Sequence, residues 1–244
     1  MRRIALFGGS FDPPHHGHLA VAAAAADHFA LDQVLFAPVG RQPFKGQFPA
    51  SDFVHRYAMT ALAVQGDVRF VPSLLDAPGN NDLREPNDAR PDYTPNYTVD
   101  TLERLRVSLI AASEPIALFT LLGADSWRDI GRWHKSACLL ALTDWIVAAR
   151  PGFSLAGAET ALPPTVKAQP IRDGAEGGLE LRHADETVTR VWFLPHLHED
   201  ISATELRAAL VRGQADAALL PAAVRSYIAK TGIYASFART DSLI

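Results

Sequence analysis

The sequence predicts an α/β fold built on a doubly wound parallel sheet, and three observations support this. Short apolar segments with the length of buried strands alternate along the chain with longer segments of helical periodicity. The order strand, helix, strand is typical of parallel sheets covered by helices on both faces. The 244 residues, 48% hydrophobic and 20% charged, suit a globular chain with a sizeable core. We therefore expect a single domain over residues 1–244, with its ligand site at the carboxyl ends of the strands.

The individual elements follow from apolar runs and the turn residues between them. Residues 3–7 form an apolar run closed by Gly8 and Gly9, which predicts a buried strand followed by a tight loop. The alanine-rich residues 17–29 predict the first helix. Further strands are expected at residues 33–38, 68–71, 116–122, 145–149 and 191–194, and further helices at residues 51–64, capped by Ser51, at residues 98–112, and from Ser202 to Arg212.

Two segments break this alternation. Residues 76–96 are crowded with Pro, Gly, Asn, Asp and Arg, and a loop of that length in a compact domain is typically functional or partly disordered. Residues 151–185 are weakly patterned and include Gly174, Gly177 and Gly178. Residues 76–96 are expected to be mobile without ligand and to become ordered around bound nucleotides, whereas the sequence assigns no role to residues 151–185.

The charge and cysteine content exclude some classes of partner. Lys and Arg number 23 against 27 Asp and Glu, a net charge of −4, so nucleic acid or an anionic membrane would meet no general attraction. We expect neither partner, and an anionic ligand would need a local pocket. The one cysteine, Cys138, excludes an intramolecular disulfide and suits the reducing cytoplasm. Because it lies in an apolar stretch, it is expected to be an inert core thiol.

The strongest local signal is the segment GGSFDPPHHGH, residues 8–18, between the first expected strand and the first expected helix. Glycines at this place let backbone amides approach a phosphate, and the helix N-terminus adds the positive end of its dipole. His15 and His18 are three residues apart and can donate to the same anion. The segment matches neither G-x-G-x-x-G nor the Walker A pattern, so the histidines must supply what a lysine would. The alternative is a histidine-rich helix cap without a ligand.

A second signal lies far along the chain, in the segment ISATELR at residues 201–207. Ser202 and Glu205 have the spacing of a capping box, which by itself predicts only a well-started helix. A helix N-terminus is also an anion site, because its first backbone N–H groups have no partner within the helix. Both interpretations can hold together.

Both segments resemble motifs of a known superfamily. FDPPHHGH matches the F-D-P-x-H-x-G-H signature of nucleotidyltransferases whose [HT]-x-G-H motif is shared with class I aminoacyl-tRNA synthetases, and ISATELR resembles their I-S-x-T-x-x-R motif. Other segments resemble the bacterial nicotinate-nucleotide adenylyltransferases, namely YTVDTL at residues 97–102, GADS at 123–126, Trp133, RPG at 150–152, and the closing residues 227–234. The resemblance covers residues 3–234 and implies a Rossmann-like nucleotidyltransferase fold with a small C-terminal helical part at residues 201–234.

The resemblance implies that ATP and nicotinate mononucleotide react to give deamido-NAD and pyrophosphate, with Mg²⁺ held mainly by the ATP phosphates and no metal site on the protein. It implies catalytic roles for His15 and His18 at the α-phosphoryl group, for Lys45 at the phosphates and for Arg207 at the triphosphate tail. The implied ATP-binding residues are Gly8, Gly9, Ser10, Phe11, Gly17, His18, Gly123, Asp125, Ile201, Ser202, Thr204 and Arg207. The implied residues for nicotinate mononucleotide are Ser10, Lys45, Tyr97, Thr98, Val99, Asp125, Trp133, His134 and Arg150.

The sequence departs from the family pattern in two places and leaves alternatives open. Phe44 stands where the family usually has His before Lys45, and residues 76–96 are longer than expected. The alternatives are a related adenylyltransferase that uses nicotinamide mononucleotide or phosphopantetheine, and a non-catalytic nucleotide-binding module. A class I synthetase is excluded by the length of the chain. The oligomeric state stays open.

Other candidate residues have simpler interpretations. His196 and His198, with Glu199 and Asp200, could chelate a metal, but they lack a helical i, i+4 spacing and are expected to form a solvated loop. A zinc site at His15, His16 and His18 is disfavoured on the same ground. Trp127 and Trp133 are expected to be core or rim residues, and only the family resemblance makes Trp133 a ring-stacking candidate.

Overall fold

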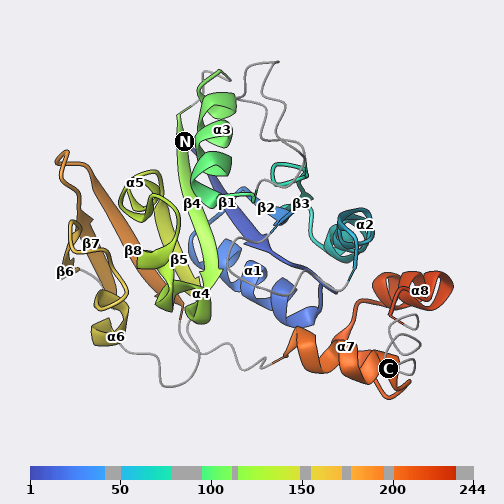
Figure 1. Ribbon diagram of the computed structural model, residues 1–244. Coiled ribbons are helices and arrows are strands. Elements are labelled where there is room, and N and C mark those ends of the chain that lie inside the picture. The colour runs from blue at the N-terminus through green and yellow to red at the C-terminus, as the bar shows by residue number, and fades with distance from the viewer. Residues whose placement is uncertain are drawn as a thin grey trace, which may run out of the picture. The chain divides into compact units, whose positions relative to one another are not determined.

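The computed structural model describes residues 1–41, 51–78, 95–111, 115–148, 155–171, 177–194 and 201–234 (Figure 1). The chain divides into two compact units, each assembled from three separate segments. Unit 1 consists of Met1–Gly8, Ala22–Leu35 and Tyr97–His198, and unit 2 of Gly9–Val21, Phe36–Asn96 and Glu199–Ile244. The residues predicted to form the site are therefore distributed over both units.

Unit 1 holds most of the central eight-stranded sheet, whose strands hydrogen-bond in the order β3-β2-β1-β4-β5-β8-β7-β6. The strands that form its parallel part are β1 (Arg2–Gly9), β2 (Gln33–Pro38), β4 (Ile116–Gly123), β5 (Asp144–Ala148) and β8 (Val188–Leu194). β4 pairs in parallel with both β1 and β5, and β5 pairs in parallel with β8. The predicted parallel α/β sheet is confirmed.

One end of the sheet is antiparallel, which the sequence did not indicate. β7 (Gly178–Arg182) pairs antiparallel with β8, and β6 (Lys167–Pro170) pairs antiparallel with β7. β6 is mostly exposed, and in β7 the apolar Leu179 and Leu181 alternate with the charged Glu180 and Arg182, so neither strand has the continuous apolar run of a buried parallel strand. At Gly178 an added Cβ would lie 2.9 Å from the carbonyl oxygen of Val191, so this close pairing requires a glycine.

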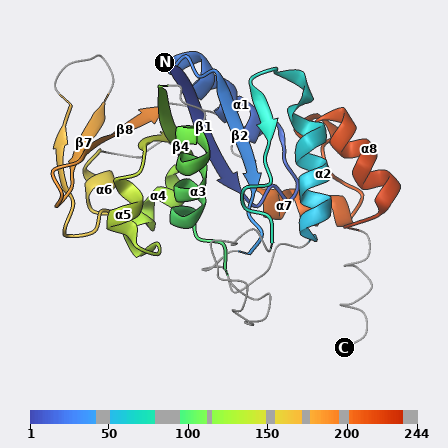
Figure 2. The same ribbon diagram turned by 90° about the horizontal axis from the view of Figure 1, so that it is seen from above.

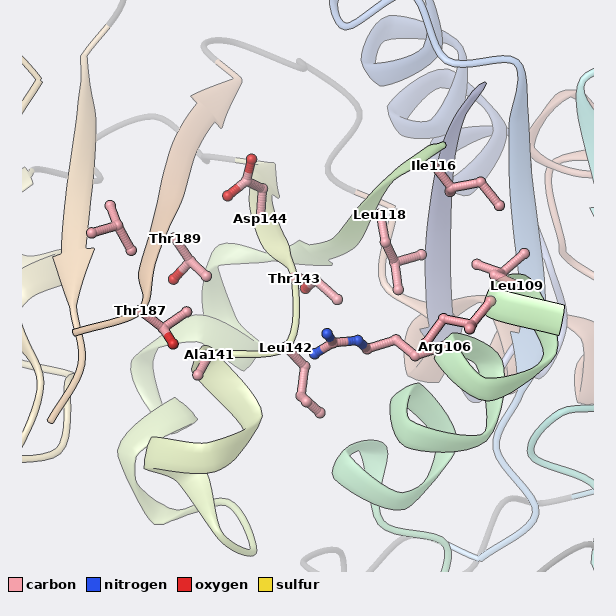
Figure 3. Close-up of a pocket in the computed structure, with 12 residues that line it drawn as sticks. Arg106, Leu109, Ile116, Leu118, Ala141, Leu142, Thr143, Asp144, Thr187 and Thr189 are labelled. Atoms are coloured by element: carbon pink, nitrogen blue, oxygen red, sulfur yellow. The ribbon is translucent and has the colours of Figure 1, made fainter. Parts of the chain in front are cut away.

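The helices of unit 1 cover both faces of its sheet. Phe29, directly after α1 (His16–His28), packs against Phe119 of β4 with ring centroids 6.0 Å apart. α3 (Thr98–Ala111) lies over the neighbouring residue of the same strand, Leu118, and shares a pocket with it (Figure 3). Adjacent residues of a strand point to opposite faces, so α1 and α3 cover opposite faces (Figure 2). This is the predicted doubly wound arrangement.

The pocket beneath α3 is not at the sheet edge where a ligand was expected. Its lining includes Ile116, Asp144 and Val188, which are the first residues of β4, β5 and β8 (Figure 3). It therefore lies at the amino ends of these strands. Ligands of open α/β sheets bind at the carboxyl ends.

Two tryptophans form the centre of the core of unit 1. Trp127 of α4 (Ala124–Arg128) and Trp145 of β5 are fully buried and meet edge to face, with ring centroids 6.0 Å apart. Each indole N–H donates to a backbone carbonyl, Trp127 to that of Ala158. The expectation that Trp127 is a core residue is confirmed. The expectation for Cys138 is wrong, because α5 (Ser136–Leu140) buries Leu139 and Leu140 and leaves the thiol exposed.

Unit 2 is mainly helical. It contains the start of α1 and the helices α2 (Phe53–Ala63), α7 (Ala203–Val211) and α8 (Ala222–Thr231), with 3-10 turns η1 (Val64–Gly66) and η3 (Ala217–Leu219). Short strand β3 (Phe70–Pro72) pairs with β2, and the Ser73 N–H donates to the Phe36 carbonyl at 2.8 Å. The core of this unit consists of Met59, Ala63, Leu206, Leu220, Val224, Ile228 and Tyr234.

Some predicted boundaries in unit 2 need correction. α2 begins at Phe53 with Asp52 in the capping position, so Ser51 is not its cap; the Ser51 hydroxyl donates to Asp12 instead. β3 begins at Phe70, because Val68 is 99% exposed and precedes the strand. The helix predicted from Ser202 is confirmed as α7. In the part of the chain that the structure describes, no helix has the length and apolar character needed to cross a membrane.

Candidate functional site

Residues 9–18 run from the last residue of β1 into the first turn of α1, lie in unit 2, and are called the signature loop below. Phe11 anchors it: the residue is 1% exposed, has φ of 47°, and packs its ring against Phe36 and edge to face against His18. An added Cβ on Gly9 would lie 3.1 Å from the Phe11 ring, a tight contact that the ring could relieve only by shifting by a few tenths of an ångström. The side chain of Phe11 thus supports the loop from inside.

His15 and His18 form a close pair at the start of α1. Their ring centroids are 3.7 Å apart, and the His15 backbone N–H donates to Nδ1 of His18 at 3.3 Å. Because His18 Nδ1 is an acceptor, the proton of the neutral ring is on Nε2, which is then a donor. Nδ1 of His15 is buried and has no hydrogen-bond partner in the described structure. His16, between them, is exposed.

Burial keeps both histidines neutral in the free protein. It lowers the pKa of His15 to about 4, with a further contribution from the charge of His16. It also lowers the pKa of His18 well below its usual range, and His15 adds to this effect. Two neutral rings that meet at 3.7 Å avoid the repulsion of two cations. The pair is suited to donating hydrogen bonds to an anion.

The protonation of this pair is testable by titration. In the free protein we expect the imidazole NMR signal of His15 to titrate near its depressed pKa of about 4, and that of His18 to titrate well below the usual histidine range, because burial lowers both pKa values. Added pyrophosphate should raise both pKa values, because a bound anion stabilises the imidazolium form. The variants His15→Asn and His18→Asn would assign the signals. Titration of either ring near pH 6.5 in the free protein would contradict the neutral pair.

Asp12 connects three parts of unit 2. It is 1% exposed, and its carboxylate accepts hydrogen bonds from the Ser51 N–H at 3.2 Å, from the Ser51 hydroxyl, and from the Tyr234 hydroxyl at 2.6 Å. Its backbone carbonyl accepts from Nη1 of Arg207 at 2.8 Å. The signature loop is therefore joined to the start of α2, to α7 and to the residues after α8.

Arg56 fixes the same loop through its backbone. This 1% exposed arginine of α2 donates to the carbonyls of Ser51, Ser10, Val39 and Gly40, at 3.1, 3.0, 2.7 and 3.4 Å. Burial lowers the pKa of its guanidinium, and the charge of Asp12 opposes that change. Carbonyl acceptors satisfy most of the donors that a buried arginine must pair.

Arg56 is not among the site residues predicted from the sequence, although its position in the helix pattern carries a signal. Arg56 is in register with the buried residues Met59, Thr60 and Ala63 on one face of α2, at the spacing i, i+3, i+4, i+7. A charged residue on a core face must find partners there. Tyr234, in the closing family segment, was noted only as part of a resemblance.

The second motif forms the first turns of α7. Ser202 caps the helix and accepts the Glu205 N–H at 3.4 Å, so the capping interaction is confirmed. Nη2 of Arg207 donates to Thr204 Oγ1 at 3.3 Å, and Nη1 reaches Asp12. The structure thus brings the two sequence motifs together within unit 2, with Ile201, partly buried, at the core of that unit.

The remaining described candidates lie in unit 1, near the carboxyl end of β4 and the start of α3. Gly8 ends the unit 1 part of β1, Gly123 ends β4, and Asp125 is exposed and 3.4 Å from Arg128. The rings of Tyr97 and His134 stack with centroids 4.2 Å apart and an angle of 28°. Thr98 and Val99, which follow Tyr97, are the first two residues of α3, and Val99 is buried. Trp133, which precedes His134, is partly buried and follows the 3-10 turn η2 (Ile130–Arg132).

Several predicted residues lie outside the described residues. They are Phe44, Lys45, Arg150, His196, His198, Glu199 and Asp200, together with residues 79–94 of the long segment. The ends of that segment are anchored to the chain after β2: the Asp76 carbonyl accepts the Gly40 N–H at 2.8 Å, and Asn96 exchanges backbone and side-chain bonds with Arg41. Among the described residues, no group of three or more His, Cys, Asp or Glu could hold a metal ion.

Comparison with known proteins agrees with this architecture. Residues 6–209 match the family model described as cytidylyltransferase-like. A protein of Chromobacterium violaceum named probable nicotinate-nucleotide adenylyltransferase is 37% identical, over 95% of this chain and 98% of its own length. A Thermus thermophilus protein of the same name is 36% identical, over 95% of this chain and 99% of its own length.

A solved structure shares the fold at low sequence identity. It is the Plasmodium falciparum nicotinic acid mononucleotide adenylyltransferase complexed with NaAD, with a TM-score of 0.64 and 17% identity over 96% of this chain and 98% of that one. Since the family model and the full-length relatives agree, the chain belongs to the cytidylyltransferase-like family and, within it, to the nicotinate-nucleotide adenylyltransferases.

Proposed function

We propose that this enzyme, acting as one nucleotidyltransferase domain, transfers the adenylyl group of ATP to nicotinate mononucleotide and releases pyrophosphate. The observation that carries the proposal is the signature loop in unit 2, which carries the pair of neutral histidines and accepts a hydrogen bond from Arg207 at the Asp12 carbonyl. Cationic and N–H donors near one loop suit a polyphosphate. The names of the full-length relatives support the same reaction.

The neutral histidines fit the chemistry of this transfer. The attacking atom is a phosphate oxygen of the mononucleotide, which is already ionised at pH 7, so no general base is needed. That oxygen forms a bond to the α-phosphorus of ATP while the bond to the bridging oxygen of pyrophosphate breaks. His15 and His18 then act as donors to the α-phosphoryl oxygens, where charge develops. A neutral imidazole still carries one N–H and can donate it to such an oxygen.

The other groups of ATP and the acceptor are assigned by the family motifs. Ser202, Thr204 and Arg207 would bind the triphosphate tail, with Lys45 at the phosphates and Asp125 on a ribose hydroxyl. Tyr97, Trp133 and His134 would surround the pyridine ring, with Arg150 toward the mononucleotide phosphate. Magnesium belongs to the co-substrate Mg-ATP, whose phosphates supply the oxygen ligands that this ion prefers.

One assay tests the proposal against its alternatives. Purified protein is incubated with Mg-ATP and, separately, nicotinate mononucleotide, nicotinamide mononucleotide or phosphopantetheine, and pyrophosphate release is followed. We expect rapid release only with nicotinate mononucleotide. Pyrophosphate release with phosphopantetheine would identify that compound as the acceptor instead of nicotinate mononucleotide. If the protein bound ATP but released no pyrophosphate with any of the three acceptors, a non-catalytic nucleotide-binding module would be favoured.

Replacing Arg207 by alanine should mainly weaken ATP binding. A guanidinium on the triphosphate tail is engaged in both the ground state and the transition state, so its loss raises KM for ATP more than it lowers kcat. Hydrogen bonds to charged groups contribute enough for an increase in KM of roughly 10- to 100-fold.

Arg212→Ala is the matched control for this variant. Arg212 is an exposed arginine at the end of the same helix, bonded to Gln214, and its loss should leave KM for ATP unchanged. Circular dichroism checks that α7 is intact. If KM for ATP were unchanged in Arg207→Ala as well, the second motif would be only a helix cap.

A further inference from the structure

Tyr234 reaches the signature loop from the far end of the described chain. α8 ends at Thr231, and its C-cap Gly232 has a φ of 63°, a left-handed conformation that turns the backbone; Tyr234 follows two residues later. The side chain is 2% exposed, and its ring belongs to the core of unit 2 with Met59 and Val224. Its hydroxyl donates to the Asp12 carboxylate at 2.6 Å.

The hydroxyl of Tyr234 is not needed for packing. Phenylalanine would fill the same space in the core, whereas burying a phenol beside a carboxylate removes both polar groups from water. Burial and the Asp12 carboxylate raise the pKa of Tyr234 above its usual value, so the hydroxyl is protonated and donates. The hydrogen bond therefore has a use beyond filling a cavity.

That use follows from the hydrogen bonds that Asp12 makes through its side-chain carboxylate and through its backbone carbonyl. Its carboxylate is held by Ser51 from the start of α2 and by Tyr234 from the residues after α8. Its backbone carbonyl holds Nη1 of Arg207, while Thr204 holds Nη2. An arginine side chain has many rotamers, and fixing it before a ligand arrives reduces the ordering cost of binding.

We propose that Tyr234 is a positioning residue for nucleotide binding: by fixing Asp12, it fixes the main-chain carbonyl that orients Arg207. This inference rests on the proposed function only in taking Arg207 to contact the phosphates of ATP. Tyr234 itself touches no substrate in this scheme. Ser51, which donates to the same carboxylate, acts in the same way.

The first experiment compares two tyrosines of the same C-terminal segment. Tyr234→Phe keeps the ring and removes the hydrogen bond to Asp12; it should raise the Kd for Mg-ATP about 5- to 20-fold, with kcat at saturating ATP changed less than about 2-fold. Tyr227→Phe removes the comparable bond between Tyr227 and His55, which is 2.8 Å long, and should leave the Kd within about 2-fold. Calorimetry measures both without an acceptor.

A double-mutant cycle separates positioning from a general loss of structure. In the Arg207→Ala background, Tyr234→Phe should have no further effect on the Kd for Mg-ATP, because the residue through which it acts is gone. Additive losses, an unchanged Kd in Tyr234→Phe, or an equal loss in Tyr227→Phe would each overturn the proposal.

A second variant covers the case in which Tyr234→Phe does not fold. Ser51→Ala removes the other hydroxyl from the Asp12 carboxylate, and its effect on the Kd for Mg-ATP should also disappear in the Arg207→Ala background. A persistent effect there would overturn the proposal. The Kd for Mg-ATP is measured without an acceptor. These results therefore test the role of Tyr234 even if nicotinate mononucleotide proves not to be the acceptor.

Discussion

Replacing His18 or His15 by alanine should lower kcat at least about 100-fold, the scale for losing one preorganised donor to charge in a transition state. Each ring is held before substrate arrives: His18 by the His15 N–H and the edge of Phe11, and His15 by its burial at the start of α1. Steady-state rates with Mg-ATP and nicotinate mononucleotide, both saturating, measure the effect.

His16→Ala is the matched control. His16 lies between the two residues at the same helix start but is exposed, so its loss should change kcat only slightly. Thermal unfolding shows whether each variant keeps its fold, which matters for His18 because its ring packs on Phe11. Near wild-type turnover in folded His15→Ala or His18→Ala would contradict a role at the α-phosphoryl group.

The parallel part of the fold could be predicted because each of its strands is recognisable from its own run of apolar residues. A strand buried on both faces is a nearly continuous apolar run, as in β4, where Thr120 alone interrupts the apolar residues from Ile116 to Leu122, and this is visible without any partner. β6 and β7 were missed because one edge strand is mostly exposed and the other alternates. Cys138 was misjudged because α5 is five residues long, too short for apolar spacing to define a face.

For the candidate site too, short sequence motifs could be recognised, whereas contacts between residues far apart in the sequence could not. The signature loop and the start of α7 are local motifs, and their residues could be named from the sequence alone. The contact of Tyr234 with Asp12 joins positions 222 residues apart, and that of Arg207 with Asp12 joins positions 195 apart. Such pairings depend on how helices pack, which no spacing in one sequence reveals.

The enzyme should prefer nicotinate mononucleotide over nicotinamide mononucleotide by at least about 100-fold in kcat/KM. The stacked rings of Tyr97 and His134 and the nearby Trp133 suit a flat pyridine ring. Tyr97 precedes α3, and its carbonyl accepts the Thr101 N–H at 3.2 Å. The backbone N–H groups of Thr98 and Val99 precede that first bond and are the free donors of a helix N-terminus, which favours a carboxylate.

The amide group of nicotinamide mononucleotide should bind less tightly than the carboxylate of nicotinate mononucleotide, both because it has no charge and because it makes poorer hydrogen bonds. A carboxylate offers two acceptor oxygens to two N–H donors, whereas an amide offers one oxygen and one NH₂, so that a donor faces a donor. A buried N–H without a partner costs about 1–3 kcal/mol, to which the lost attraction between a negative charge and the helix N-terminus is added. Together these reach the roughly 2.7 kcal/mol that a 100-fold preference requires. The measurement is kcat/KM for both mononucleotides at one saturating concentration of Mg-ATP, and comparable values would show that the rings only pack around the pyridine and that the enzyme has dual specificity.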